Sequence, residues 1–145
     1  MKKFSLLILS VLLLSCSSDS NDEAVTKEGN FLEVYNGVIW KNYNERIKVS
    51  YWFVFTPTSL SEAEYIDGHN DCQVYISKWG VDDGDGKAVI KENSKNLLKF
   101  DYVLPNGEIE DSYSLTTSQN GNVLNFSMSD GGADTFDRVT TKPCE

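Results

Sequence analysis

Ile47-Lys48-Val49-Ser50-Tyr51-Trp52-Phe53-Val54-Phe55-Thr56 is the stretch that decides the fold of this chain. Apolar side chains occupy alternate positions, and Pro57 follows directly; the alternating set is Ile47, Val49, Tyr51, Phe53 and Phe55. A period of two places these side chains on one face of a β-strand. Because proline cannot continue a strand ladder, we expect the strand to end at Thr56.

Strand patterns recur along the rest of the chain. We expect further strands at 38–43, 64–66 (short and weak), 72–79, 88–92, 97–104, 109–117, 123–128 and 135–140. Segments rich in Asp, Asn, Gly and Pro separate them and predict tight turns. A short helical turn is expected at 30–35, with Gly37 as its end. The pattern predicts an all-β fold, an antiparallel up-and-down meander of about eight or nine short strands that closes into a barrel.

The N-terminal residues have the layout of a secretory signal peptide. Lys2 and Lys3 precede an apolar run from Phe4 to Leu14, which is shorter than the roughly 20 residues of a membrane-spanning helix. The run ends in Leu13-Leu14-Ser15-Cys16, which resembles the lipobox of bacterial lipoproteins. This resemblance implies cleavage before Cys16 and acylation of its thiol and new amino group, which would anchor the chain in a membrane. An ordinary cleaved signal followed by an unrelated cysteine is the alternative.

On this resemblance the chain divides into a signal peptide (1–15), a lipidated flexible tether (16–29) and a barrel domain (30–145). Ser17 rather than an aspartate follows the cysteine, which in such lipoproteins favours the outer membrane. Asp19, Asp22 and Glu23 fit either a signal for display on the cell surface or a merely solvated tether. We therefore expect a lipid-anchored protein of the outer membrane, on its periplasmic face or on the cell surface.

The chain is acidic, with a formal net charge of −9. Removal of residues 1–15, which carry two lysines and no acid, takes this charge to −11. Such a surface repels phosphate backbones, so we expect no nucleic acid partner. The sequence has no phosphate-binding glycine loop, nucleophile elbow or triad spacing. We therefore expect no cofactor, and we rank enzymatic activity last among the functions.

Two cysteines, Cys72 and Cys144, are left if Cys16 carries lipid. Outside the cytosol thiols oxidise, so we expect a disulfide that also holds the last residues in place. Two free thiols are the alternative. A metal pair or a catalytic thiol is least favoured, since His69 is the only histidine in the sequence.

The segment Tyr35-Asn36-Gly37-Val38-Ile39-Trp40 joins the expected helical turn to the first strand. It resembles the lipocalin signature, although the family spacing Gly-x-Trp is one residue shorter, and the chain from about residue 31 to 144 is similar to lipocalin-like domains of small bacterial lipoproteins. The resemblance implies a barrel whose narrow end is closed by Trp40, with Arg138 of the last strand packed across it, as a cation–π pair would favour. The alternatives are an open or flattened sheet, and a Trp40 that makes no contact with Arg138.

Two acidic segments match metal sites only in part. In 81–86, Asp83, Asp85 and the later Glu92 would take positions three, five and twelve of a calcium loop, but Val81 at position one cannot bind a metal. The other segment, with Asp67, His69 and Asp71, has one histidine and no ordered ligand spacing. We expect a hairpin turn in the first, a plain turn in the second, and no metal site.

Aromatic residues lie at intervals along the expected strands: Tyr51, Phe53, Phe55, Tyr75, Trp79, Tyr102 and Tyr113. In a small barrel such side chains usually fill the interior. Alternatively, some of them line a cup for a small hydrophobic ligand, with tyrosine hydroxyls that orient it.

The sequence therefore predicts a lipid-anchored, lipocalin-like protein of the cell envelope that binds a small apolar ligand in its barrel. An interaction or accessory module with a fully packed core and an unknown protein partner is the alternative. A cavity of about 300 Å³ or more, lined by the aromatic residues, would favour ligand binding.

Overall fold

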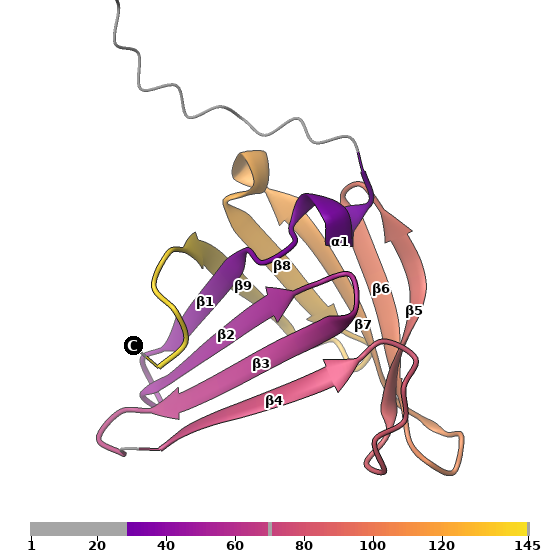
Figure 1. Cartoon of the computed structure of the whole chain (residues 1–145). Helices are drawn as coiled ribbons and strands as arrows, with labels where there is room; N and C mark the ends of the chain where they lie inside the picture. Colours follow the sequence, from indigo (N-terminus) through magenta and orange to yellow (C-terminus); the bar gives the residue numbers. More distant parts are fainter. Residues whose placement is uncertain (1–28, 70, 145) are drawn as a thin grey trace, which may run out of the picture.

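The computed structural model describes residues 29–69 and 71–144, which form a nearly closed antiparallel barrel behind one short helix (Figure 1). The predicted signal peptide, the tether and Cys16 lie outside these residues, apart from Gly29. The elements are α1 (Phe31–Val34), β1 (Ile39–Asn44), β2 (Val49–Phe55), β3 (Ser59–Ile66), β4 (Cys72–Lys78), β5 (Lys87–Ser94), β6 (Leu97–Val103), β7 (Ile109–Ser118), η1 (Gln119–Gly121), β8 (Val123–Met128) and β9 (Ala133–Val139).

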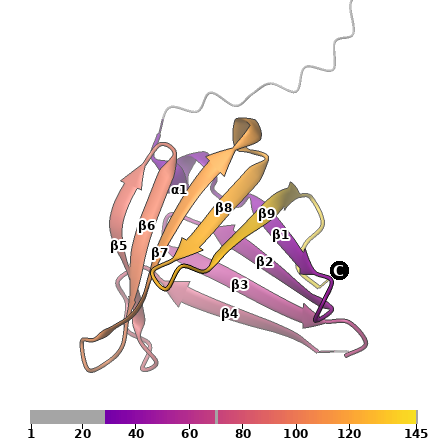
Figure 2. The same cartoon turned by 180° about the vertical axis from the view of Figure 1, so that it is seen from behind.

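Strands that are consecutive in the chain pair with each other, except for β4 and β5. The strand order is β4-β3-β2-β1-β9-β8-β7-β6-β5, so the first strand pairs with the last (Figure 2). The gap in the barrel therefore lies between β4 and β5, where Trp79 and Ala88 form an isolated parallel bridge. The expected all-β antiparallel meander is confirmed, with its gap in the middle of the chain rather than between its ends.

The alternating stretch forms β2 and supplies much of the inner face. Phe53 and Phe55 are buried in the core, with Tyr51 packed against them. β2 begins at Val49 because Lys48 adopts a positive φ of 58° in the preceding turn. Ile47, expected on the core face, is therefore left out of the strand and is 46 % exposed.

The helix α1 closes one end of the barrel. Asn30 caps it by accepting a hydrogen bond from the Glu33 N–H at 3.1 Å, while the Glu33 carboxylate accepts from the Asn30 N–H. Phe31 and Leu32 are buried below the cap, at 0 % and 2 % exposure. Because this seals only one end, any opening into the interior lies at the other end or at the β4–β5 gap. None of the described helices is long and apolar enough to cross a membrane.

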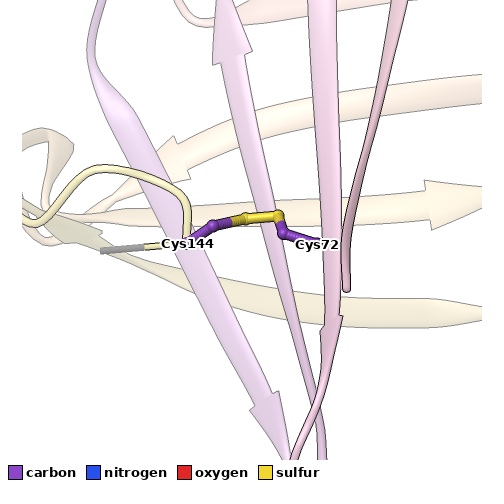
Figure 3. The surroundings of a disulfide bond; sticks show 2 residues. All are labelled: Cys72 and Cys144. Atoms are coloured by element: carbon purple, nitrogen blue, oxygen red, sulfur yellow. A yellow bond between two sulfur atoms is a disulfide. The ribbon is translucent and has the colours of Figure 1, made fainter. Parts of the chain in front are cut away.

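A disulfide joins the end of the chain to β4. The segment after β9 runs back across β1, β2 and β3 on the outer side, and Cys144 is bonded there to Cys72, with 5.9 Å between their Cα atoms (Figure 3). The outward-facing Trp52 of β2 is 3 % exposed, and the Lys41 ammonium lies 4.8 Å from its ring. The expected disulfide is confirmed.

Two expectations about the middle of the chain are wrong. The weak strand expected at 64–66 is the eight-residue β3, which pairs with both β2 and β4. The sequence shows no apolar alternation over this strand, because Glu62 and Glu64 occupy positions that face inward. The acidic segment 82–86 is no hairpin turn, because β4 and β5 form no ladder that it could join.

Candidate ligand-binding cup

The barrel contains a cavity of about 660 Å³ at the end opposite to α1. It lies between the inner faces of strands on both sides of the β4–β5 gap. Its walls are mainly aromatic and apolar, and the rings that line it are Tyr51, Phe53, Tyr75, Phe100, Tyr102, Tyr113, Phe126 and Phe136. We call this cavity the cup.

The floor of the cup is a chain of packed rings. The Phe53 ring lies 5.4 Å from that of Phe126 and 4.8 Å from that of Phe136, centroid to centroid. Tyr113 continues the chain, at 5.4 Å from Phe126 and 4.8 Å from Phe100. Five strands supply these rings, so the floor depends on closure of the sheet through β1 and β9. Stacked and tilted rings at such spacings form a stiff apolar surface.

Carboxylates line the cup beside these rings. They come from β3, the β4–β5 loop, β7 and β9, and they are Glu62, Asp83, Asp85, Glu110 and Asp134. No Lys, Arg or His is found among the residues that line the cup in the described part of the chain. The walls therefore combine apolar rings with negative charge.

Glu62 is the half-buried member of this set. It points inward from β3, with Phe53 of β2 and Tyr75 of β4 as its cross-strand neighbours. Burial, followed by repulsion from Glu64, raises the pKa of its carboxyl above the ordinary value. Within residues 29–69 and 71–144, its carboxylate takes part in no hydrogen bond or salt bridge.

Three of the tyrosines that line the cup have raised pKa values. Burial, then the charges of Asp111 and Glu62, raise the pKa of Tyr113 to about 12. Burial first, and then nearby carboxylates, also raise the pKa values of Tyr51 and Tyr102. All three hydroxyls stay protonated at neutral pH; that of Tyr113 donates to Asp111 at 3.4 Å, and those of Tyr51 and Tyr102 can donate hydrogen bonds to a bound molecule.

The β4–β5 gap gives access to the cup from the side. Residues 74–77 of β4 line the cup, and the free edge of this strand faces the gap. Trp79 fixes the C-terminal end of β4, because its indole N–H donates to the Thr56 carbonyl at 3.0 Å and its ring lies 5.4 Å from that of Phe100. The two strands diverge away from this point (Figure 1).

The structure places five of the seven predicted aromatic residues at the cup: Tyr51, Phe53, Tyr75, Tyr102 and Tyr113. Phe55 instead packs in the core, edge-on to Phe31 below α1, and Trp79 lies at the β4–β5 crossing. Sequence reasoning missed Phe100, Phe126 and Phe136 as well as the carboxylates. The alternation Leu98, Phe100, Tyr102 contained the signal for the first of these.

Trp40 and Arg138 are cross-strand partners where β1 meets β9. Trp40 is fully buried with its ring 5.7 Å from that of Tyr35, and its indole nitrogen has no hydrogen-bond partner among residues 29–69 and 71–144. The side chain of Arg138 is exposed. The cation–π contacts in the described part are made by Lys41 and Lys48. Trp40 and Arg138 therefore lie opposite each other on the β1–β9 ladder that closes the barrel, but they make no cation–π contact.

Carboxylates of both acidic segments accept hydrogen bonds from the protein itself. Asp82 accepts from the Gly84 N–H at 2.9 Å and Asp83 from the Asp85 N–H at 3.3 Å, while the Tyr43 hydroxyl donates to Asp67 at 2.7 Å. Across the described residues, no three His, Cys, Asp or Glu side chains are grouped so that they could hold a metal ion.

A shallower depression of about 390 Å³ on the outside of β7, β8 and β9 is lined mainly by small polar side chains.

Comparisons of the chain with protein-family models, with curated proteins and with solved structures gave no match.

Proposed function

We propose that this chain is a lipid-anchored cell-envelope protein whose barrel binds a small, largely apolar ligand in the cup. The observation that carries the proposal is the cavity of about 660 Å³ with its aromatic floor. This volume lies within the range of roughly 300–1,000 Å³ that is usual for small-molecule sites. A fully packed interior, the other expectation for these aromatic residues, would leave no such space.

The cup also has a route of access. The end below α1 is sealed by Phe31 and Leu32, whereas the β4–β5 gap has no ladder to hold it shut. An apolar ligand would exchange water-exposed rings for packed contacts, at about 25 cal/mol for each Å² of apolar surface buried. The protonated tyrosines Tyr51 and Tyr102 would supply hydrogen bonds that orient it.

Filling the cup tests the proposal. We expect the mature chain (16–145, with Cys16→Ser so that no acyl group or detergent competes) to bind the neutral fluorescent probe N-phenyl-1-naphthylamine. Leu60 lines the cup, so Leu60→Trp should weaken binding at least about tenfold by occupying the space. Ser61 on the opposite face of β3 gives the matched control, and Ser61→Trp should leave binding unchanged. Absence of probe binding, or equal loss in both variants, would refute ligand binding in the cup.

The anchor part of the proposal rests on Leu13-Leu14-Ser15-Cys16. We expect the native chain to fractionate with membranes and to resist extraction by high salt, because acyl chains rather than charges hold it. Cys16→Ser should abolish acylation, as measured by mass spectrometry of the N-terminal peptide. An unmodified Cys16 in the native chain would overturn this part and leave the ligand proposal standing.

A second candidate function is an interaction module, and the surface of β4 is the observation that favours it. Val74, Tyr75 and Ile76 are each more than half exposed, on a strand with one unpaired edge. Exposed apolar side chains at a sheet edge are unusual in a protein that acts alone. A crosslinker at position 76 that captures one consistent protein in whole cells would support this function, whereas capture of none would count against it.

A further inference from the structure

We propose that the ligand of the cup carries a positive charge, so that the cup selects an organic cation: an ammonium group on an apolar body. This inference rests on the proposed function, because it names the chemical class of the same ligand. It follows from the charges that surround the cup and from one carboxylate, that of Glu62, which has no counter-charge among the described residues.

Asp101 and Glu62 are both partly removed from water, but they differ in their partners and in the direction of their pKa shifts. Asp101 faces the outer side of β6 and is 6 % exposed; it accepts a hydrogen bond from the Ser112 hydroxyl at 2.7 Å and pairs with the Lys91 ammonium at 3.1 Å. These partners lower the pKa of Asp101 below its ordinary value, the Ser112 hydrogen bond most strongly. Glu62 has no such partner among the described residues, and the pKa of its carboxyl is raised instead. An ammonium ion in the cup would supply the counter-charge.

The other charges around the cup have the same sign. Asp83 and Asp85 approach from the β4–β5 loop, Glu110 from β7 and Asp134 from β9, next to Phe126. With no basic side chain among the described lining residues, the electrostatic potential in the cup is negative from several directions. A fatty acid, the obvious apolar anion, would be repelled, whereas a cation would be attracted.

The aromatic floor fits the same class of ligand. Phe53, Phe126 and Tyr113 form neighbouring rings in the cup, and Phe53 is also the cross-strand neighbour of Glu62. An ammonium group is attracted to the face of an aromatic ring as well as to a carboxylate. The apolar body of the ligand would pack on the remaining rings. One molecule would thus contact both the carboxylates and the apolar rings of the cup.

A metal ion fits this arrangement poorly. The carboxylates are spread over four elements, and the described residues contain no group of three that could bind one ion together. Calcium needs six to eight oxygen ligands at 2.3–2.6 Å. A bulky cation, which needs contacts on several sides at longer range, matches the spread of charges better.

Competition for the probe tests the inference. Three monomeric ligands with the same ten-carbon chain, decyltrimethylammonium, decanol and decanoate, would be titrated against N-phenyl-1-naphthylamine bound to the mature chain. We expect the cation to displace the probe at about tenfold lower concentration than decanol, and decanoate to be the weakest. The preference should shrink at high salt, which screens the charges.

Glu62→Gln should remove most of the preference for the cation and leave decanol binding unchanged. The matched control is Glu92→Gln, which makes the same charge change on the outer side of β5, where Glu92 pairs with Lys99 at 3.3 Å; it should keep the preference. Equal displacement by cation and alcohol, or strongest displacement by decanoate, would overturn the inference while the proposed function stands. Failure of the probe to bind at all would overturn both.

Discussion

Glu62 is the residue at which the stability of the fold and the proposed binding of a ligand favour different side chains. It lies opposite Phe53 and Tyr75 in the sheet and is largely removed from water, where an apolar side chain would pack with less cost. Residues that bind ligands commonly lower the stability of the protein that carries them. The raised pKa of Glu62 is the sign of that cost in this barrel.

Glu62→Gln should therefore stabilise the free protein at neutral pH. Because the pKa of Glu62 is raised on folding, the folded state binds its proton more tightly than the unfolded state does. The cost of the charge is thus fully present above the folded pKa and vanishes below the unfolded value. Urea unfolding should show a higher free energy of unfolding for the variant at about pH 7.5 and no difference near pH 3. Lower stability at pH 7.5 would show that the carboxylate has a stabilising partner.

At the scale of elements, α1 acts as a plug rather than as an independent helix. It has only four residues, too few for stability alone, and it is held by Phe31 and Leu32 in the core and by the Leu32 N–H, which donates to Asn93 at 3.3 Å. The Tyr35 hydroxyl, just after the helix, bonds Thr117 at 2.8 Å. Packing therefore contributes more to this end than the cap does.

Two variants separate packing from capping. Phe31→Ala should lower the free energy of unfolding by about 3–5 kcal/mol, because it leaves a cavity at a fully buried site. Asn30→Ala removes only the cap and should cost about 1 kcal/mol. Urea unfolding of both variants measures the difference, and equal small losses would show that α1 does not hold the end of the barrel.

The strands β2 and β3 show how far periodicity predicts an element. β2 was predicted within two residues because its inward positions are apolar, as a buried face requires. For β3 the pattern predicts only residues 64–66. The inward positions of this strand include Glu62 and Glu64, and the hydrophobic pattern assigns such residues to solvent. The prediction failed where the inner face borders the cup, because acidic side chains there take inward positions that a packed core would give to apolar residues.

At the scale of the whole molecule, the disulfide ties the last residues to an edge strand. Cys72 and Cys144 are separated by 72 residues, so the bond constrains a long loop in the unfolded chain. It also holds the segment after β9 across the outer side of β1 to β3. Stability of the edge next to the β4–β5 gap should therefore depend on it.

Replacing both cysteines by serine should lower the free energy of unfolding by about 4 kcal/mol, from the entropy of the released loop. The same loss should follow when the unaltered protein is unfolded under reducing conditions. The double variant, which has no such bond, is the control and should not respond to reductant. A loss well below 2 kcal/mol would show that strand pairing alone holds the C-terminal segment.

The sequence by itself determined the class of fold, most of the strands and turns, and the cysteine pair, because alternation, turn residues and a small number of cysteines are local or countable properties. Five of the seven aromatic residues that it proposed do line the cup. Their alternation shows that they face inward, but it cannot show whether the interior is filled.

Only the tertiary structure decided that the barrel closes through β1 and β9, opens between β4 and β5 and leaves a cup with acidic walls. Each of these depends on the register of strands that are far apart in the chain and on the volume that all their side chains leave unfilled together. Glu62 becomes a candidate binding residue in the same way. Its aromatic neighbours, Phe53 and Tyr75, lie next to it across the sheet and are distant from it in sequence.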